Sequence, residues 1–102
     1  MLTGKQKRYL RGLGHNLKPV IVVGKGGVSD SLIREADEAL ESHELIKVKI
    51  LEGCLTDRNE VSTELAEACN AQCAQLLGRT ILLYRRAKEA KIELPKKLKA
   101  ED

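Results

Sequence analysis

The junction between an apolar run and a cluster of glycines restricts the fold of this chain more than any other feature. The run PVIVV at residues 19–23 is followed at once by GKGG at residues 24–27, and the helix-start signal Ser29-Asp30 comes next. Glycines let backbone N–H groups approach an anion closely, and a helix N-terminus adds favourable partial positive charge. The junction therefore predicts a strand, an anion-binding loop and a helix, in this order.

Hydrophobic periodicity and helix-start signals extend this unit to seven elements. We expect a first helix that starts at Thr3 and ends near Gly12 or Gly14, and further helices over residues 29–43 and 57–72. Strands are expected over residues 19–23, 45–51, 73–77 and 80–85. Two capping boxes, Thr3-x-x-Gln6 and Asp57-x-x-Glu60, open the first and third helices. The order α-β-α-β-α-β-β predicts a mixed α/β (α+β) domain in which three helices pack on a four-stranded mixed sheet, with crossover connections through the helices.

Two strands carry opposite patterns. Residues 19–23 are continuously apolar, which predicts a strand that is covered on both faces. Residues 45–51 alternate, so Lys47 and Lys49 are expected on an open face, where lysines commonly protect a sheet from aggregation. The segment after Arg86 is charge-rich, and we expect it to be partly helical as far as Pro95.

The charges are segregated along the chain. The net charge is +3, but residues 1–25 carry six basic and no acidic side chains, whereas residues 26–67 carry four basic and eleven acidic ones. Such asymmetry favours a polyanionic partner. Tyr9 and Tyr84 are the only aromatic residues, which disfavours stacking on single-stranded bases and favours recognition of the backbone of a structured nucleic acid.

The glycine loop can be compared with known nucleotide-binding motifs. A Walker A loop requires GxxxxGK[ST], and here Ser29-Asp30 stands where the second glycine and the phosphate-binding lysine would be. The dinucleotide fingerprint GxGxxG fails at its third glycine, which is Ser29. A GxxG loop before a helix remains, the arrangement by which KH-type domains clamp backbone nucleotides. Its alternative interpretation is an ordinary strand-to-helix turn.

Basic side chains supply the candidate binding residues beside this loop. The loop itself contributes Gly24, Lys25, Gly26 and Gly27, and the acid-free N-terminal segment contributes Lys5, Lys7, Arg8, Arg11 and Lys18. The alternative for the first helix is a merely solvated face. A second group either extends this surface or only solubilises the end of the sheet: Arg79, Arg85 and Arg86.

Catalytic chemistry is not indicated. His15 and His43 stand at expected helix ends, and Cys54, Cys69 and Cys73 lack CxxC spacing and a neighbouring base. We therefore expect no enzyme activity, no cofactor and no metal site. Three cysteines, and a start that leads directly into a charged helix without a signal peptide or membrane span, favour a reducing cytoplasm.

Three segments in the same order and spacing resemble the stand-alone CRM domain of the bacterial YhbY family. They are LTGKQKRYLR at residues 2–11, PVIVVGKGGV at residues 19–28 and GRTILLYR at residues 78–85. The resemblance implies a single RNA-binding domain over residues 1–97, followed by a charged, frayed tail at residues 98–102. It also implies a fold similar to the C-terminal domain of translation initiation factor three. Stand-alone members are associated with precursors of the large ribosomal subunit, and related plant organelle proteins assist splicing of group II introns.

The leading hypothesis is a monomeric, non-enzymatic protein that binds structured rRNA during large-subunit assembly, through the GxxG loop and the basic first helix. One alternative is an adaptor whose acidic second helix binds a basic partner such as a ribosomal protein. Another, motivated only by the glycine loop, is a small nucleotide-binding enzyme.

Overall fold

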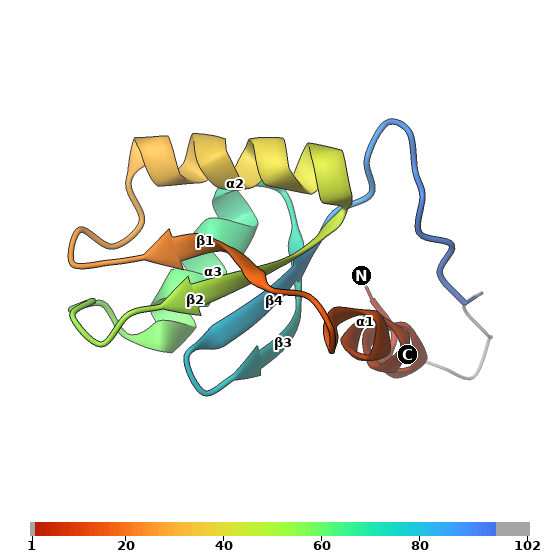
Figure 1. Cartoon of the computed structure of the whole chain (residues 1–102), viewed down its shortest axis with the longest axis horizontal. Coiled ribbons are helices and arrows are strands. Elements are labelled where there is room, and N and C mark those ends of the chain that lie inside the picture. The colour runs from red at the N-terminus through yellow and green to blue at the C-terminus, as the bar shows by residue number, and fades with distance from the viewer. Residues whose placement is uncertain (1, 96–102) are drawn as a thin grey trace.

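A computed structural model describes residues 2–95 and confirms the predicted order of elements (Figure 1). The predicted tail at residues 98–102, and residues 96–97 of the predicted domain, lie outside the described residues. The helices and strands are α1 (Gly4–Gly14), β1 (Pro19–Val23), α2 (Asp30–His43), β2 (Leu45–Ile50), α3 (Arg58–Ala68), β3 (Gln72–Leu77) and β4 (Thr80–Tyr84).

The four strands form one mixed sheet in the order β1-β2-β4-β3. Strand β1 pairs parallel with β2, and β4 pairs antiparallel with both β2 and β3. Strand β3 therefore runs in the direction of β2, with β4 between them. The connections through α2 and α3 are both crossovers between strands of the same direction, as predicted. The β3–β4 hairpin turns at Gly78, whose φ is +58°, a conformation that glycine adopts without steric cost.

Local sequence explains where the helices begin. Thr3 and Gln6 form the predicted capping box, in which the Gln6 N–H donates to Thr3 Oγ1 at 3.1 Å and the Thr3 N–H donates to Gln6 Oε1 at 3.0 Å. Ser29 caps α2 by accepting the Leu32 N–H at 3.2 Å. At α3 the Asp57 carboxylate accepts the N–H of Asn59 at 3.0 Å. This helix is therefore capped through its second N–H, and not through the Glu60 backbone as the predicted box requires.

The predicted extent of α3 is wrong at its end. The helix stops at Ala68, four residues before the predicted limit, and Asn70 has a φ of +53°. The Ala71 N–H donates to the Ala66 carbonyl at 2.8 Å and the Asn70 N–H donates to the Glu67 carbonyl at 3.2 Å. This is a Schellman ending with asparagine in the left-handed position, which releases the chain into β3.

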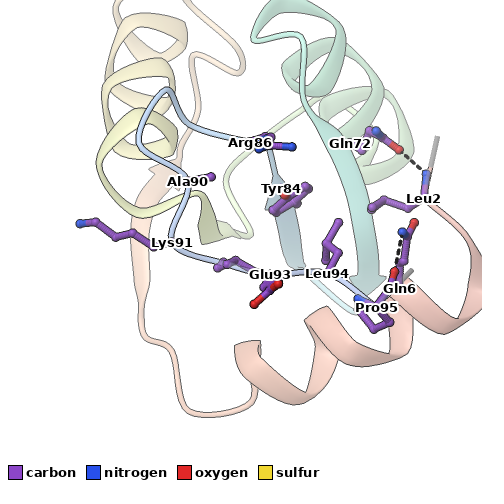
Figure 2. Close-up of a pocket in the computed structure, with 11 residues that line it drawn as sticks. Leu2, Gln6, Gln72, Tyr84, Arg86, Ala90, Lys91, Glu93, Leu94 and Pro95 are labelled. Atoms are coloured by element: carbon purple, nitrogen blue, oxygen red, sulfur yellow. Dashed lines mark hydrogen bonds between the residues drawn. The ribbon is translucent and has the colours of Figure 1, made fainter. Parts of the chain in front are cut away.

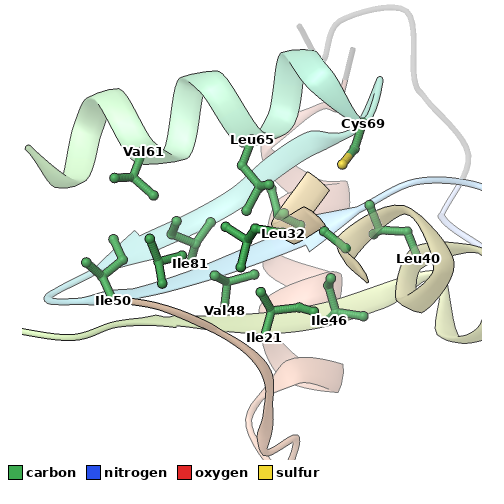
Figure 3. Close-up of a cluster of buried hydrophobic side chains, with 13 residues drawn as sticks. Ile21, Leu32, Leu40, Ile46, Val48, Ile50, Val61, Leu65, Cys69 and Ile81 are labelled. Atoms are coloured by element: carbon green, nitrogen blue, oxygen red, sulfur yellow. The ribbon is translucent and has the colours of Figure 1, made fainter. Parts of the chain in front are cut away.

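Two hydrophobic clusters lie on opposite faces of the sheet. The larger one fills the space between the sheet and helices α2 and α3, with Ile46, Val48 and Ile50 of β2 in its centre (Figure 3). The smaller one joins α1 to the other face through Leu10, Leu82 and Tyr84. Alternation along the strands explains this division, since successive side chains point to opposite faces.

Strand β1 is covered on one face only, so the prediction of a strand covered on both faces is wrong. Ile21 and Val23 are buried against α2, but Val20 and Val22 are each 49% exposed. Strand β1 is an edge strand, and α1 packs over β2, β3 and β4 instead. A continuous apolar run does not reveal which of its two faces a helix covers.

Residues 86–95 contain no helix, so the predicted helical continuation is also wrong. The segment is held in an irregular path by Glu44, a buried residue at the end of α2 whose carboxylate accepts the main-chain N–H groups of Ala87, Lys91 and Ile92. Burial opposes ionisation of this carboxylate, but the three N–H donors and nearby Arg86 outweigh it and hold the pKa of Glu44 below its usual value.

The same segment closes over the smaller cluster (Figure 2). Ile92 and Leu94 pack against that cluster, and the Gln6 side-chain amide donates to the Pro95 carbonyl at 3.0 Å. Leu2 is fixed nearby, because its N–H donates to Gln72 Oε1 at 2.7 Å. These contacts hold α1 and residues 92–95 against each other. Within residues 2–95, no helix has the length and apolar character needed to cross a membrane.

Candidate nucleic-acid interface

The glycine loop (residues 24–27) is a tight turn at the end of β1 (Figure 1). The Gly27 N–H donates to the Gly24 carbonyl at 3.0 Å, and Gly27 has a φ of +65°. A Cβ at Gly27 would lie 3.2 Å from Thr56 Oγ1, whereas one at Gly26 would meet nothing within 4 Å. Lys25 and Gly26 are exposed. The loop therefore presents a lysine and a bare backbone to solvent from a conformation that favours glycine at position 27.

The helix after the loop contributes less positive potential than expected. Ser29 uses the Leu32 N–H for capping, and Asp30 is the first residue of α2. A carboxylate in the first turn already offsets the positive end of a helix dipole. Binding of an anion here therefore depends mainly on the Lys25 ammonium and the backbone of the loop.

A second loop and an arginine lie at the same end of the sheet. Leu51, just after β2, donates its N–H to the Val23 carbonyl at 2.9 Å, which ties it to the start of the glycine loop. Arg79 of the β3–β4 turn donates to the Leu51 carbonyl at 3.2 Å and remains exposed. The structure thus connects Arg79 through Leu51 to Val23, the residue that directly precedes the glycine loop.

The basic helix α1 lies at the other end of β1, across the face of the sheet opposite to α2 and α3 (Figure 1). Its four basic side chains are all exposed, as is Lys18 in the connection to β1: Lys5, Lys7, Arg8 and Arg11. No acidic residue occurs in α1, whereas α2 and α3 together carry eight acidic and two basic residues. The sheet therefore separates a basic side of the molecule from an acidic one.

The open face of β1 and β2 joins the basic helix to the glycine loop. Val22 pairs with Lys49, and Pro19 pairs with Lys47 nearer to α1. Lys49 is exposed and Lys47 is half-buried. The sequence pattern predicts these lysines only as protection of the sheet. The alternating pattern predicted their face correctly, but it carried no signal that this face connects two basic regions.

The remaining two arginines have different surroundings. The Arg85 guanidinium donates to Asp37 Oδ1 at 2.5 Å, to the Cys69 carbonyl at 2.9 Å and to Glu41 Oε1 at 3.5 Å. It is therefore engaged on the acidic side, where it ties α2 to the end of α3. Arg86 is exposed beside Tyr84 and the 90–95 segment (Figure 2). A role for either in RNA binding stays a prediction.

Cys69 and Tyr84 are titratable residues of the hydrophobic core, and burial shifts the pKa of each away from reactivity. Cys69 is buried, and its thiol lies 3.6 Å from the Ile33 carbonyl as a hydrogen-bond donor. Burial, with the nearby carboxylate of Asp37, raises the pKa of this thiol, which lowers its reactivity. Burial, with Glu44 nearby, likewise raises the pKa of Tyr84. Over residues 2–95, no three His, Cys, Asp or Glu side chains are grouped to hold a metal ion.

Known proteins share this sequence and fold. A family model described as the CRS1/YhbY (CRM) domain matches residues 2–85. The chain is 52% identical over 96 residues to a Bacillus subtilis protein named Probable RNA-binding protein YqeI, covering 93% of this chain and 100% of that protein. It is 38% identical over 96 residues to a Haemophilus influenzae protein named RNA-binding protein, covering 94% of this chain and 97% of that one. The solution structure of hypothetical protein SAV1595 from Staphylococcus aureus matches with a TM-score of 0.80 at 48% identity, covering 93% of this chain and 100% of that chain.

Proposed function

Since this chain belongs to the CRS1/YhbY (CRM) domain family, we propose that it binds structured RNA through the glycine loop, the open face of β1 and β2, and the basic helix α1. The observation that carries the proposal is the separation of charge across the sheet. The acid-free helix α1 lies on the face of the sheet that is free of α2 and α3, and the exposed Lys25 stands at the far end of β1, beyond the open face with Lys49. The names of the Bacillus and Haemophilus relatives support RNA as the ligand.

The contacts would be made mainly to phosphates. Lysine and arginine side chains supply charge-assisted donors, and the bare backbone at Gly26 permits close approach. Phosphate contacts fix the register and orientation of a protein on a nucleic acid but carry no direct sequence information. The shape of the RNA would therefore decide where this protein binds.

We further propose rRNA in a precursor of the large ribosomal subunit as the RNA, with the protein acting as a cytoplasmic monomer. The support is the resemblance to stand-alone YhbY proteins over the three segments quoted above. In this role the protein performs no reaction and needs no cofactor.

A salt titration tests the RNA proposal. Binding to a structured fragment of large-subunit rRNA should weaken steeply with salt, and Lys25→Glu should reduce both the affinity and the slope of the salt dependence. Arg34→Glu, on the exposed surface of α2, is the matched control with the same change in charge. Equal binding by wild type and Lys25→Glu would show that the glycine loop is only a turn and does not bind RNA. Salt-independent binding would contradict the proposal that the protein contacts RNA phosphates.

A second function is favoured by the eight acidic residues on α2 and α3. This surface suits a basic protein, such as a ribosomal protein, while the opposite side holds RNA. The double variant Glu35→Lys/Glu38→Lys tests it, because both side chains are exposed and neither belongs to the Arg85 cluster. Loss of a basic partner with unchanged RNA affinity would establish the second surface, and unchanged partner binding would remove it.

A further inference from the structure

A small groove between the end of α1 and the open face of the sheet has the chemistry of an anion site. Its volume is about 210 Å³, and its polar lining comes from Arg11, His15, Lys47, Gln75 and Thr80. These residues belong to α1 and its C-cap and to strands β2, β3 and β4. The site therefore forms only in the folded chain, and no local sequence motif predicts it.

Strand register explains why the polar side chains meet. Leu82 of β4 pairs with Lys47 of β2 on one side and with Gln75 of β3 on the other. Directly paired residues project from the same face of a sheet, so Lys47 and Gln75 flank Leu82. Thr80 lies two residues before Leu82 in the same strand and so shares that face.

Gly14 brings the helix close enough to complete the groove. A Cβ at this position would lie 2.8 Å from Leu82 Cδ1, so the last turn of α1 rests directly on the floor of the groove. Arg11 and His15 stand on either side of Gly14 in the chain and line the groove from the side of the helix. Any side chain at position 14 would hold these two groups further from Lys47.

Every polar group of the lining can donate a hydrogen bond, and the lining contains no carboxylate. An ammonium, a guanidinium, an imidazole, a hydroxyl and an amide around one small hollow are the donors that suit a phosphate oxyanion. This side of the fold also lacks the acidic residues of α2 and α3 that would repel an anion.

We propose that this groove binds a phosphate group of the RNA, as a second site separate from the glycine loop. The inference rests on the proposed function and deepens it. Lys47 pairs with Pro19 at the start of β1, and the glycine loop follows Val23 at its end. Five strand residues correspond to roughly 17 Å, so the two sites hold phosphates at different places along one RNA.

Two measurements test the groove. First, inorganic phosphate is titrated into the wild-type protein and followed by amide chemical shifts. Saturable shifts at His15, Gln75 and Thr80 are expected, and their absence, or unsaturable shifts spread over all exposed amides, would overturn the proposal. Second, Arg11→Gln and Lys47→Gln should each lower the salt slope of RNA binding by about one unit, whereas the matched surface variant Arg34→Gln should not.

The glycine-loop variant separates this inference from the proposed function. If Lys25→Glu weakens RNA binding while Arg11→Gln and Lys47→Gln bind like Arg34→Gln, the groove proposal is wrong and the RNA function stands. If phosphate saturates the groove but the wild-type protein does not bind RNA, the proposed function fails and the groove remains a site for another phosphorylated ligand. Thermal unfolding of each variant confirms that its fold is intact.

Discussion

The carboxylate of Glu44 accepts the main-chain N–H of Ile92 at 2.9 Å, although the two residues are 48 positions apart in the chain. Together with the N–H groups of Ala87 and Lys91, this contact fixes residues 87–92 against the end of α2. A single ionised side chain thus replaces the secondary structure that this segment lacks.

Acid should release this segment. The folded state lowers the pKa of Glu44, so its contribution to stability is fully present above the pKa of the unfolded chain and is lost as pH falls through the lower folded value. Glu44→Gln should cost about 2 kcal/mol at pH 7, since a neutral amide accepts more weakly and its NH₂ faces donors. Urea unfolding at pH 7 and in acid measures this. A difference between wild type and variant that does not shrink in acid would contradict the assignment.

The same substitution at Arg79 and at Arg85 should change different properties, RNA binding at Arg79 and stability at Arg85. Arg85→Gln should reduce the free energy of unfolding by about 1–2 kcal/mol, because it removes charged hydrogen bonds to Asp37, Glu41 and the Cys69 carbonyl. Arg79→Gln should leave stability nearly unchanged and lower the salt slope of RNA binding by about one unit. Urea unfolding and RNA titration of both variants check the pair. A weaker RNA affinity for folded Arg85→Gln would show that Arg85 contributes to RNA binding.

Two glycines of the loop should separate folding from binding. Gly27→Ala should destabilise the protein by about 1–2 kcal/mol, because an L-residue is strained at a φ of +65°. Gly26→Ala should fold normally, since its Cβ meets nothing within 4 Å, but it should weaken RNA binding by blocking close approach of a phosphate. Thermal unfolding and RNA titration measure the two effects. Full RNA affinity in Gly26→Ala would show that the backbone there is not approached.

Two glycines of α1 provide a matched test of how the helix sits on the sheet. Gly12→Ala should stabilise the protein by about 0.5–1 kcal/mol through helix propensity, because its Cβ would meet nothing within 4 Å. Gly14→Ala should instead lose about 1–3 kcal/mol, because its Cβ would overlap the buried Leu82 side chain. Urea unfolding of both variants decides the matter. Equal stabilisation would mean that α1 does not rest on Leu82.

Local chemistry made the elements predictable. Thr3 and Gln6 mark the start of α1 by their own hydrogen bonds, Ser29 marks α2, and alternation assigned Lys47 and Lys49 to the open face. These signals are complete within a few residues of sequence. For the same reason the order of helices and strands, and with it the fold class, followed from the sequence.

Features that depend on distant partners were not predictable in this way. Arg85 and Arg86 are neighbours of the same type, and the positions of Asp37, Glu41 and the Cys69 carbonyl, which are distant in the sequence, distinguish them. The exposure of Val20 and Val22 depends on where α1 packs. The groove at Lys47 requires strand register and the close approach of Gly14 to Leu82. The end of α3 is an exception, since Asn70 was a local signal that the periodicity of the helix concealed.

The division of charge by the sheet makes the molecule a permanent electric dipole. A protein with such a dipole is turned by the field of a polyanion before the two surfaces touch, so more of its diffusional encounters begin in a productive orientation. Added salt shortens the range of this field to about a nanometre. At low salt, the acidic helices α2 and α3 therefore increase the rate of association without contacting the RNA, because repulsion turns their side of the protein away from it.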